Sequence, residues 1–133
     1  MIRKFKLGDH LILKPNEHSG IGDILDVFFD DTFTKYSLED EDDIKCIICW
    51  KQHFPKHYGV FFLMSDNISS KHARELKRFV DDIAEKMKPR SCITYSFDCD
   101  TLNRWHNFFG FEKQRKSLLD KADGFNVWLI KWD

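Results

Sequence analysis

The sequence has no long apolar run, no strong excess of charge of one sign and no tract rich in proline, glycine or serine. Its longest clear apolar run, Val60 to Met64, is far too short to cross a bilayer, and no apolar leader segment follows Met1. We therefore expect no membrane span and a cytoplasmic location. The 21 Lys and Arg against 22 Asp and Glu leave a net charge of -1, so no global field favours nucleic acid, and no nucleic-acid partner is expected.

The composition is that of an ordinary folded chain with many large apolar side chains. Of the 133 residues, 42% are hydrophobic and 13 are Phe, which excludes a disordered protein. A chain of this length can bury a sufficient core without disulfides or a structural metal. We expect one domain over residues 1–133, with an aromatic-rich core.

Four cysteines are present, and two of them have the spacing of a metal motif. Cys46 and Cys49 lie inside a β-branched run that is typical of a strand, where an odd offset points the two sulfurs to opposite faces. A zinc knuckle would also need a turn and a second pair of ligands. We therefore predict reduced, mostly buried thiols, Cys92 and Cys99 included, and no metal site.

The hydrophobic periodicity predicts alternating strands and helices. Strands are expected over 10–14, 34–38, 43–52, 57–65, 91–97 and 125–132, and helices over 20–31, 69–89 and 101–109. An acidic turn, Glu39 to Asp43, and a turn containing Pro55 separate three consecutive strands, which predicts an antiparallel meander.

Two of these elements have the clearest patterns. Gly59 to Met64 is apolar at every position, which is typical of a strand near the sheet centre that is covered on both faces. The helix after it has an apolar stripe, a Ser69 or Ser70 cap and a stop at Pro89.

This order of elements, and the segment LNRWHNFFGFEK from Leu102 to Lys113, resemble the Gcn5-related N-acetyltransferase (GNAT) superfamily. Gly110 and Phe111 stand where the family has a Gly-Phe corner after its last helix. The resemblance implies an α/β fold with a mixed central sheet, an antiparallel meander and flanking helices. It also implies transfer of an acyl group from acetyl-CoA or another acyl-CoA to an amine acceptor.

From about Gly59 onward, a little over half of the chain is similar to small acetyltransferase-like proteins of tailed phages, the internal virion protein A group. That resemblance implies a phage protein acting in the host cytoplasm. It also implies an alternative function on the same fold, a noncatalytic protein of phage assembly or of the virion, or one that binds a host protein. The sequence does not indicate the oligomeric state.

In the family, backbone N–H groups of a glycine-rich loop at the start of the long helix hold the pyrophosphate of coenzyme A, as helix N-termini hold anions generally. Here the two leading glycines fall on Ser69 and Lys71, and only the closing small residue, Ala73, conforms. The resemblance thus implies a degenerate loop and weak or lost catalysis. The predicted cofactor-binding residues are Met64, Ser65, Ser69, Ser70, Lys71, His72, Ala73 and Arg74.

Two interpretations of this helix start remain open. Serine hydroxyls together with the charges of Lys71, His72 and Arg74 would make an unusual phosphate site. In the second interpretation, the helix start is a plain serine cap followed by a solvated first turn.

The family's proton donor to the departing thiolate is commonly a Tyr four residues before the corner glycine, a position that His106 occupies here. An imidazole titrates in the useful range, so His106 is the predicted catalytic acid, although helical histidines are also common on half-exposed faces. Asp66, just beyond the central strand, is the nearest candidate for a general base. A V-shaped opening between the strands ending at Met64 and beginning near Ser91 would favour cofactor binding.

Overall fold

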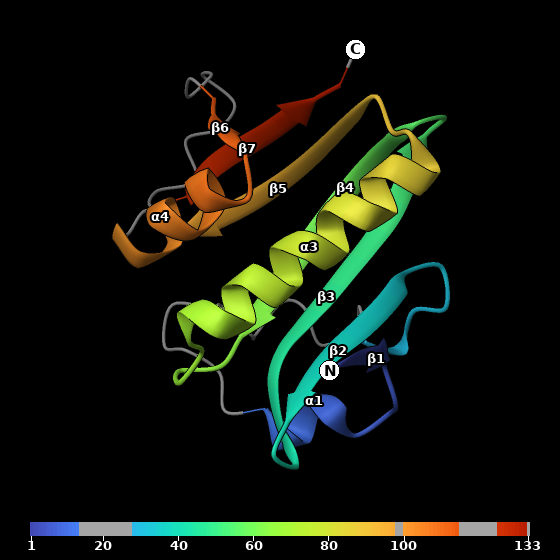
Figure 1. Ribbon diagram of the computed structural model, residues 1–133. Helices are drawn as coiled ribbons and strands as arrows, with labels where there is room; N and C mark the ends of the chain where they lie inside the picture. Colours follow the sequence, from blue (N-terminus) through green and yellow to red (C-terminus); the bar gives the residue numbers. More distant parts are fainter. Residues whose placement is uncertain (14–27, 98–99, 115–124, 133) are drawn as a thin grey trace.

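The computed structural model describes residues 1–13, 28–97, 100–114 and 125–132. Its centre is a seven-stranded sheet with the order β1-β2-β3-β4-β5-β7-β6 (Figure 1). The strands are β1 Ile2–Lys4, β2 Thr34–Asp40, β3 Asp43–Phe54, β4 His57–Met64, β5 Ser91–Phe97, β6 Glu112–Lys113 and β7 Phe125–Lys131. The helices of the described part are α1 Asp9–Ile12, α3 Ser70–Met87 and α4 Asp100–Phe108. The predicted α/β class with a mixed sheet is confirmed.

Neighbouring strands run antiparallel except β4 and β5, which run parallel. Strands β2, β3 and β4 form the predicted antiparallel meander. The first hairpin turns at Glu41 and Asp42, whose φ angles of 53° and 62° are those of a type I′ turn. The acidic turn predicted over 39–43 is therefore too long, because the acidic residues flanking this pair belong to β2 and β3.

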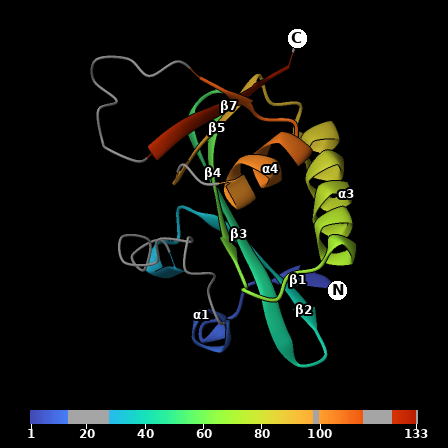
Figure 2. The same cartoon turned by 90° about the vertical axis from the view of Figure 1, so that its left-hand side faces the viewer.

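The sheet is covered on both faces. Helices α3 and α4 lie on one face and α1 lies on the other (Figure 2). Residues Val60 and Met64 of β4 belong to the core cluster under α3 and α4, whereas Leu63 belongs to the cluster on the opposite face. The prediction that this strand is central and covered on both faces is confirmed.

The cysteines follow the predicted alternation. Cys46 lies in the core under α3 and α4, and Cys49 lies in the core of the opposite face. Burial raises the pKa of the Cys49 thiol to about 12, and it raises that of Cys92 to about 12 as well. These thiols are therefore protonated at neutral pH. Cys99 lies outside the described residues, and no group of three or more His, Cys, Asp or Glu in the described part could hold a metal ion.

The long helix α3 begins and ends as its sequence predicts. Ser69 is the N-cap of the helix. Its last residue is Met87, followed by the C-cap Lys88, which has a left-handed φ of 49° and precedes Pro89. Its apolar stripe is anchored by Leu76, which is 1% exposed in the core. In the described part, no helix is long and apolar enough to cross a membrane.

At the N-terminus the predicted strand over 10–14 is wrong. His10 lies in α1, and the edge strand is instead β1, which pairs with β2. Gly8 adopts a φ of 106°, which only glycine adopts readily, and this turns the chain into α1. The turn is fixed by Asp9, which accepts hydrogen bonds from Arg3 Nη1 at 2.8 Å and from Ser37 Oγ at 2.8 Å. The hydrogen bond from Ser37 joins residues 28 positions apart, so the hydrophobic pattern could not indicate it.

Burial works to raise the pKa of the Asp9 carboxyl, but hydrogen bonds from Arg3, the Lys6 amide and Ser37 outweigh it and lower that pKa.

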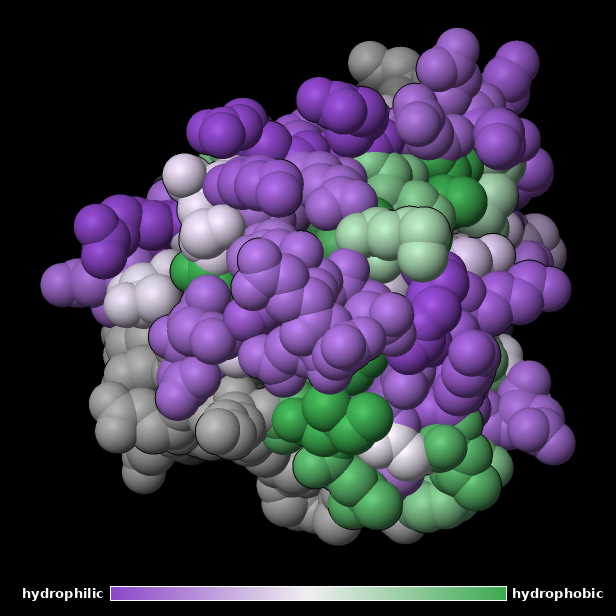
Figure 3. All heavy atoms as spheres, turned by 60° about the horizontal axis from the view of Figure 1, so that its bottom comes forward, coloured by the Kyte–Doolittle hydropathy of each residue, from purple (hydrophilic) through white to green (hydrophobic). Residues whose placement is uncertain are grey.

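Around α1, the side chains of Leu7, Leu11 and Ile12 are exposed. The face of the molecule in Figure 3 is mainly hydrophilic, with hydrophobic side chains gathered in places. The helix predicted over 20–31 falls mostly outside the described residues, although Phe28 is described and is 3% exposed.

Candidate functional site

The parallel strands β4 and β5 are paired only at their amino ends. The pairs are His57 with Ser91, Tyr58 with Cys92 and Gly59 with Ile93. Beyond these pairs, β4 stays paired with β3 and β5 stays paired with β7. The two strands therefore diverge toward their carboxyl ends, as Figure 1 shows. This is the strand arrangement that would favour cofactor binding, and carboxyl ends of parallel strands are where ligands of open α/β sheets bind.

The first turn of α3 follows β4 closely and is held by a reciprocal cap. The backbone N–H of Ser69 donates to His72 Nδ1 at 3.1 Å, and the His72 N–H donates to Ser69 Oγ at 3.4 Å. Because Nδ1 accepts a hydrogen bond, the neutral ring carries its proton on Nε2, which donates to Asp40 Oδ2 at 2.8 Å. This bond is the main cause that lowers the pKa of the Asp40 carboxyl.

The cap leaves part of the helix end available to a ligand. Among the described residues, the backbone N–H groups of Ser70 and Lys71 have no hydrogen-bond partner, whereas that of Ala73 donates to the Ser69 carbonyl. The side chains of Lys71 and Arg74 are exposed and form no ion pair within the described part. Two free donors and two cations at a helix N-terminus favour an anion.

His72 differs from the cation expected in the phosphate-binding interpretation. It is only 6% exposed, and its ring is committed to Ser69 and Asp40. The sequence gives no signal for this contact, because 32 positions separate His72 from Asp40. In the structure His72 fixes the cap, and its role toward a cofactor stays a prediction.

The other predicted residues of this region lie in the link between β4 and α3. Met64 and Ser65 are buried, and the Ser65 N–H donates to the Lys45 carbonyl at 2.8 Å. The Ser65 hydroxyl donates to Asn67 Oδ1 at 2.5 Å. Asp66 is exposed, so its carboxylate is open to solvent and accessible to a polar substrate.

His106 lies on the buried side of α4 and contacts two strands. Its ring stacks on Trp128 of β7 with centroids 5.1 Å apart, and it meets the Phe62 ring of β4 edge-on. Its Nδ1–H donates to the Leu102 carbonyl at 2.7 Å. Because β5 lies between β4 and β7 in the sheet, His106 sits over the region where β4 and β5 diverge.

Burial lowers the pKa of His106, and the hydrogen bond to Leu102 opposes this only in part. The neutral ring therefore has its proton on Nδ1 and a lone pair on Nε2, which has no partner in the described part. In this state His106 accepts a proton or a hydrogen bond rather than donating one at Nε2. Next to it, the buried Trp105 Nε1–H is a donor that has no partner among the described residues.

We predict that NMR of labelled histidine will show His106 as the neutral Nδ1–H form at pH 7, titrating below 6.5, its ordinary value. Because its folded pKa is the lower one, the unfolded chain binds the proton more readily, so stability is lost as pH falls from 6.5 toward the folded pKa. The same residue measured in urea provides the control. A titration midpoint of His106 above 6.5 in the folded protein would contradict the buried environment of its ring.

The corner after α4 has the geometry that its sequence predicted. Gly110 has a φ of 91°, and the Phe111 N–H donates to the His106 carbonyl at 3.0 Å. The glycine accepts this φ because it lacks a Cβ. Phe111, 4% exposed, then enters the core.

No family model and no curated protein matches the sequence. Solved structures match the fold across nearly the whole chain. The GNAT domain of PAT from S. lividans has a TM-score of 0.73 at 10% identity, covering 98% of this chain and 89% of that one. IAA acetyltransferase from Bacillus cereus has a TM-score of 0.72 at 8% identity, covering 99% of both chains.

A third structure, a GNAT family acetyltransferase from Elizabethkingia anophelis with acetyl-CoA bound, has a TM-score of 0.66 at 10% identity and covers 99% of this chain and 97% of that one. These matches show that the chain has the GNAT fold, the acyl-CoA N-acyltransferase architecture. Fold alone does not define the reaction, because function resides in the site.

Proposed function

We propose that this protein binds acyl-CoA at the start of α3 and acts as a weak N-acyltransferase toward an amine acceptor. The observation that carries the proposal is the combination at one end of the sheet of the β4–β5 divergence with the free N–H groups of Ser70 and Lys71. The GNAT fold of the chain supports it, and so does the acetyl-CoA bound to one protein of that fold.

The residues at this end fit a pyrophosphate group. The N–H groups of Ser70 and Lys71 would donate to its oxygens, and the exposed cations Lys71 and Arg74 would neutralise its charge. Glycines are absent from this turn, so Cβ atoms limit how closely phosphates approach the backbone. We therefore expect weaker binding than a glycine-rich loop provides.

Bound acyl-CoA would supply a thioester carbonyl that an amine can attack. The acyl group then moves from sulfur to nitrogen, the nitrogen loses one proton and the thiolate gains one. Neutral His106 can take a proton on Nε2 and, once protonated, return it to the thiolate. Asp66, exposed beyond β4, would attract a positively charged amine and take the extra proton that the ammonium form must lose before it attacks, so the proton handled by His106 is the second one.

Calorimetric titration with acetyl-CoA and with desulfo-CoA tests the proposal without requiring a known acceptor. We expect micromolar dissociation constants for both ligands, because the pyrophosphate is common to them. Measuring at two temperatures prevents a binding enthalpy near zero from being taken for no binding. Absence of heat at millimolar ligand at both temperatures would refute the proposal.

The second candidate is a noncatalytic protein of phage assembly, or one that binds a host component. The Ser69–His72 cap supports only the noncatalytic part of this candidate, because it already uses two of the N–H groups at the helix end. This candidate predicts that the folded protein binds neither ligand, so the same titration separates the two functions.

A further inference from the structure

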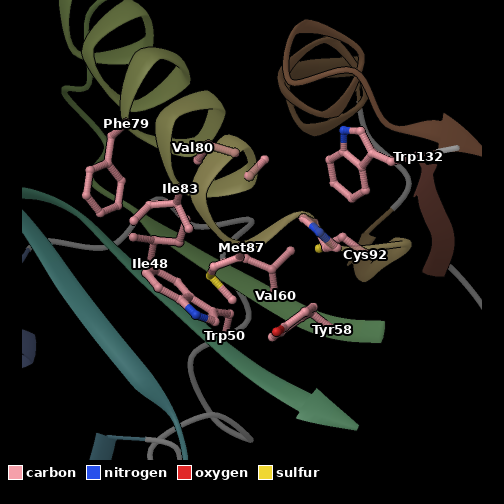
Figure 4. A pocket seen from close by; sticks show the side chains of 12 residues that line it. Ile48, Trp50, Tyr58, Val60, Phe79, Val80, Ile83, Met87, Cys92 and Trp132 are labelled. Carbon is pink, nitrogen blue, oxygen red and sulfur yellow. The ribbon is translucent and has the colours of Figure 1, made fainter. Parts of the chain in front are cut away.

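A small apolar pocket of about 70 Å³ lies between the second half of α3 and the sheet. Figure 4 shows side chains from several elements converging on it. Helix α3 contributes Phe79 and Met87, β3 contributes Trp50, β4 contributes Val60 and β5 contributes Cys92.

The lining defines the chemistry of an occupant. The pocket is lined by carbon-rich side chains, no charged group lines it, and the Tyr58 hydroxyl already donates to Gln52 Oε1 at 3.3 Å. Burial raises the pKa of the Cys92 thiol to about 12, so it is uncharged. Water would find few partners in such a space, whereas apolar cavities bind apolar molecules. The occupant is therefore uncharged and hydrocarbon in character.

The position of the pocket links it to the proposed cofactor site. Val60 directly follows Gly59 and Cys92 directly precedes Ile93, the last residues paired between β4 and β5. The pocket therefore lies beside the paired ends of β4 and β5, on the face covered by α3. Along α3 it begins at Phe79, roughly 14 Å from Ser70 by the helix rise of 1.5 Å per residue.

We propose that this pocket receives the hydrocarbon tail of the acyl donor, so that the protein prefers acyl-CoA with a chain longer than acetyl. The inference rests on the proposed acyl-CoA site: a ligand held by its pyrophosphate at the start of α3 and extended along β4 would direct its acyl carbons toward Val60 and Cys92. Charged acyl groups would be disfavoured, because the pocket offers them no partner.

The test compares desulfo-CoA, acetyl-CoA, butyryl-CoA and hexanoyl-CoA by calorimetry. We expect about fourfold tighter binding for each added methylene until the pocket is filled. Two variants shift this series in opposite directions. Ala84→Leu fills the pocket and should abolish the gain from longer chains, while Met87→Ala enlarges it and should extend the gain to a longer chain.

The outcomes separate this inference from the proposed function. Equal binding of acetyl-CoA and hexanoyl-CoA would overturn the tail pocket while the cofactor site stands. A chain-length gain that neither variant alters would also overturn it, because the tail would then lie elsewhere. If none of the four ligands binds, the proposed function fails and the tail pocket fails with it. Desulfo-CoA affinity should be the same in both variants as in the unmodified chain.

Discussion

Replacement of Trp128 by alanine is expected to lower the free energy of unfolding by about 3–5 kcal/mol. Trp128 is 1% exposed and is the largest of the fully buried side chains in the described part. It stacks on His106 and packs in the core cluster that joins β7 to α3 and α4. Alanine would leave a cavity between these elements that the surrounding sheet cannot close.

Trp132→Ala is the matched control, because Trp132 is the same residue type just beyond β7 and is only partly buried at the pocket rim. Urea unfolding followed by far-UV circular dichroism should show a much smaller loss for this variant. Equal losses for the two variants would contradict the placement of Trp128 at the centre of this core.

Reversal of both charges at the start of α3, in the double variant Lys71→Glu with Arg74→Glu, should weaken desulfo-CoA binding about 100-fold. Both side chains are exposed and have no ion-pair partner in the described part, and the only internal interaction that their reversal changes there is the attraction of Lys71 for Asp40. It replaces two attractive charges beside the proposed pyrophosphate site with two repulsive ones. The effect should shrink at high salt, because exposed charges are screened.

Lys86→Glu provides the control for this variant. It reverses one charge, where the double variant reverses two, on an exposed residue of the same helix, but in its last turn. Its desulfo-CoA affinity should stay within about twofold of that of the unmodified chain. If Lys86→Glu and the double variant weakened binding equally, the effect would come from net charge and not from a site at the helix start.

The sequence was sufficient for the elements whose patterns are local. The stripe of α3, its Ser69 cap and the alternation that separates Cys46 from Cys49 all follow from side-chain periodicity, and the structure confirms them. The Gly110 corner was equally clear, because few residues tolerate its φ.

Contacts between distant segments were not predictable in this way. At the N-terminus, Asp9 accepts a hydrogen bond from Ser37, 28 positions away, and α1 stands where the strand over 10–14 was predicted. The strand β6 has only the residues Glu112 and Lys113, both exposed, so it has no apolar pattern. The sequence offered His72 as a positive charge beside a phosphate. It did not predict the hydrogen bond between His72 and Asp40, which holds the ring at the helix cap.

The central claim is that the first turn of α3 holds the pyrophosphate of coenzyme A. Amide NMR of the ¹⁵N-labelled protein during titration with desulfo-CoA tests it most directly, because it reports each backbone N–H separately. We expect the largest downfield proton shifts at Ser70 and Lys71, with a small shift at Ala73, whose N–H already donates to Ser69. Saturable binding with unchanged Ser70 and Lys71 amides, or no binding at all, would contradict the claim.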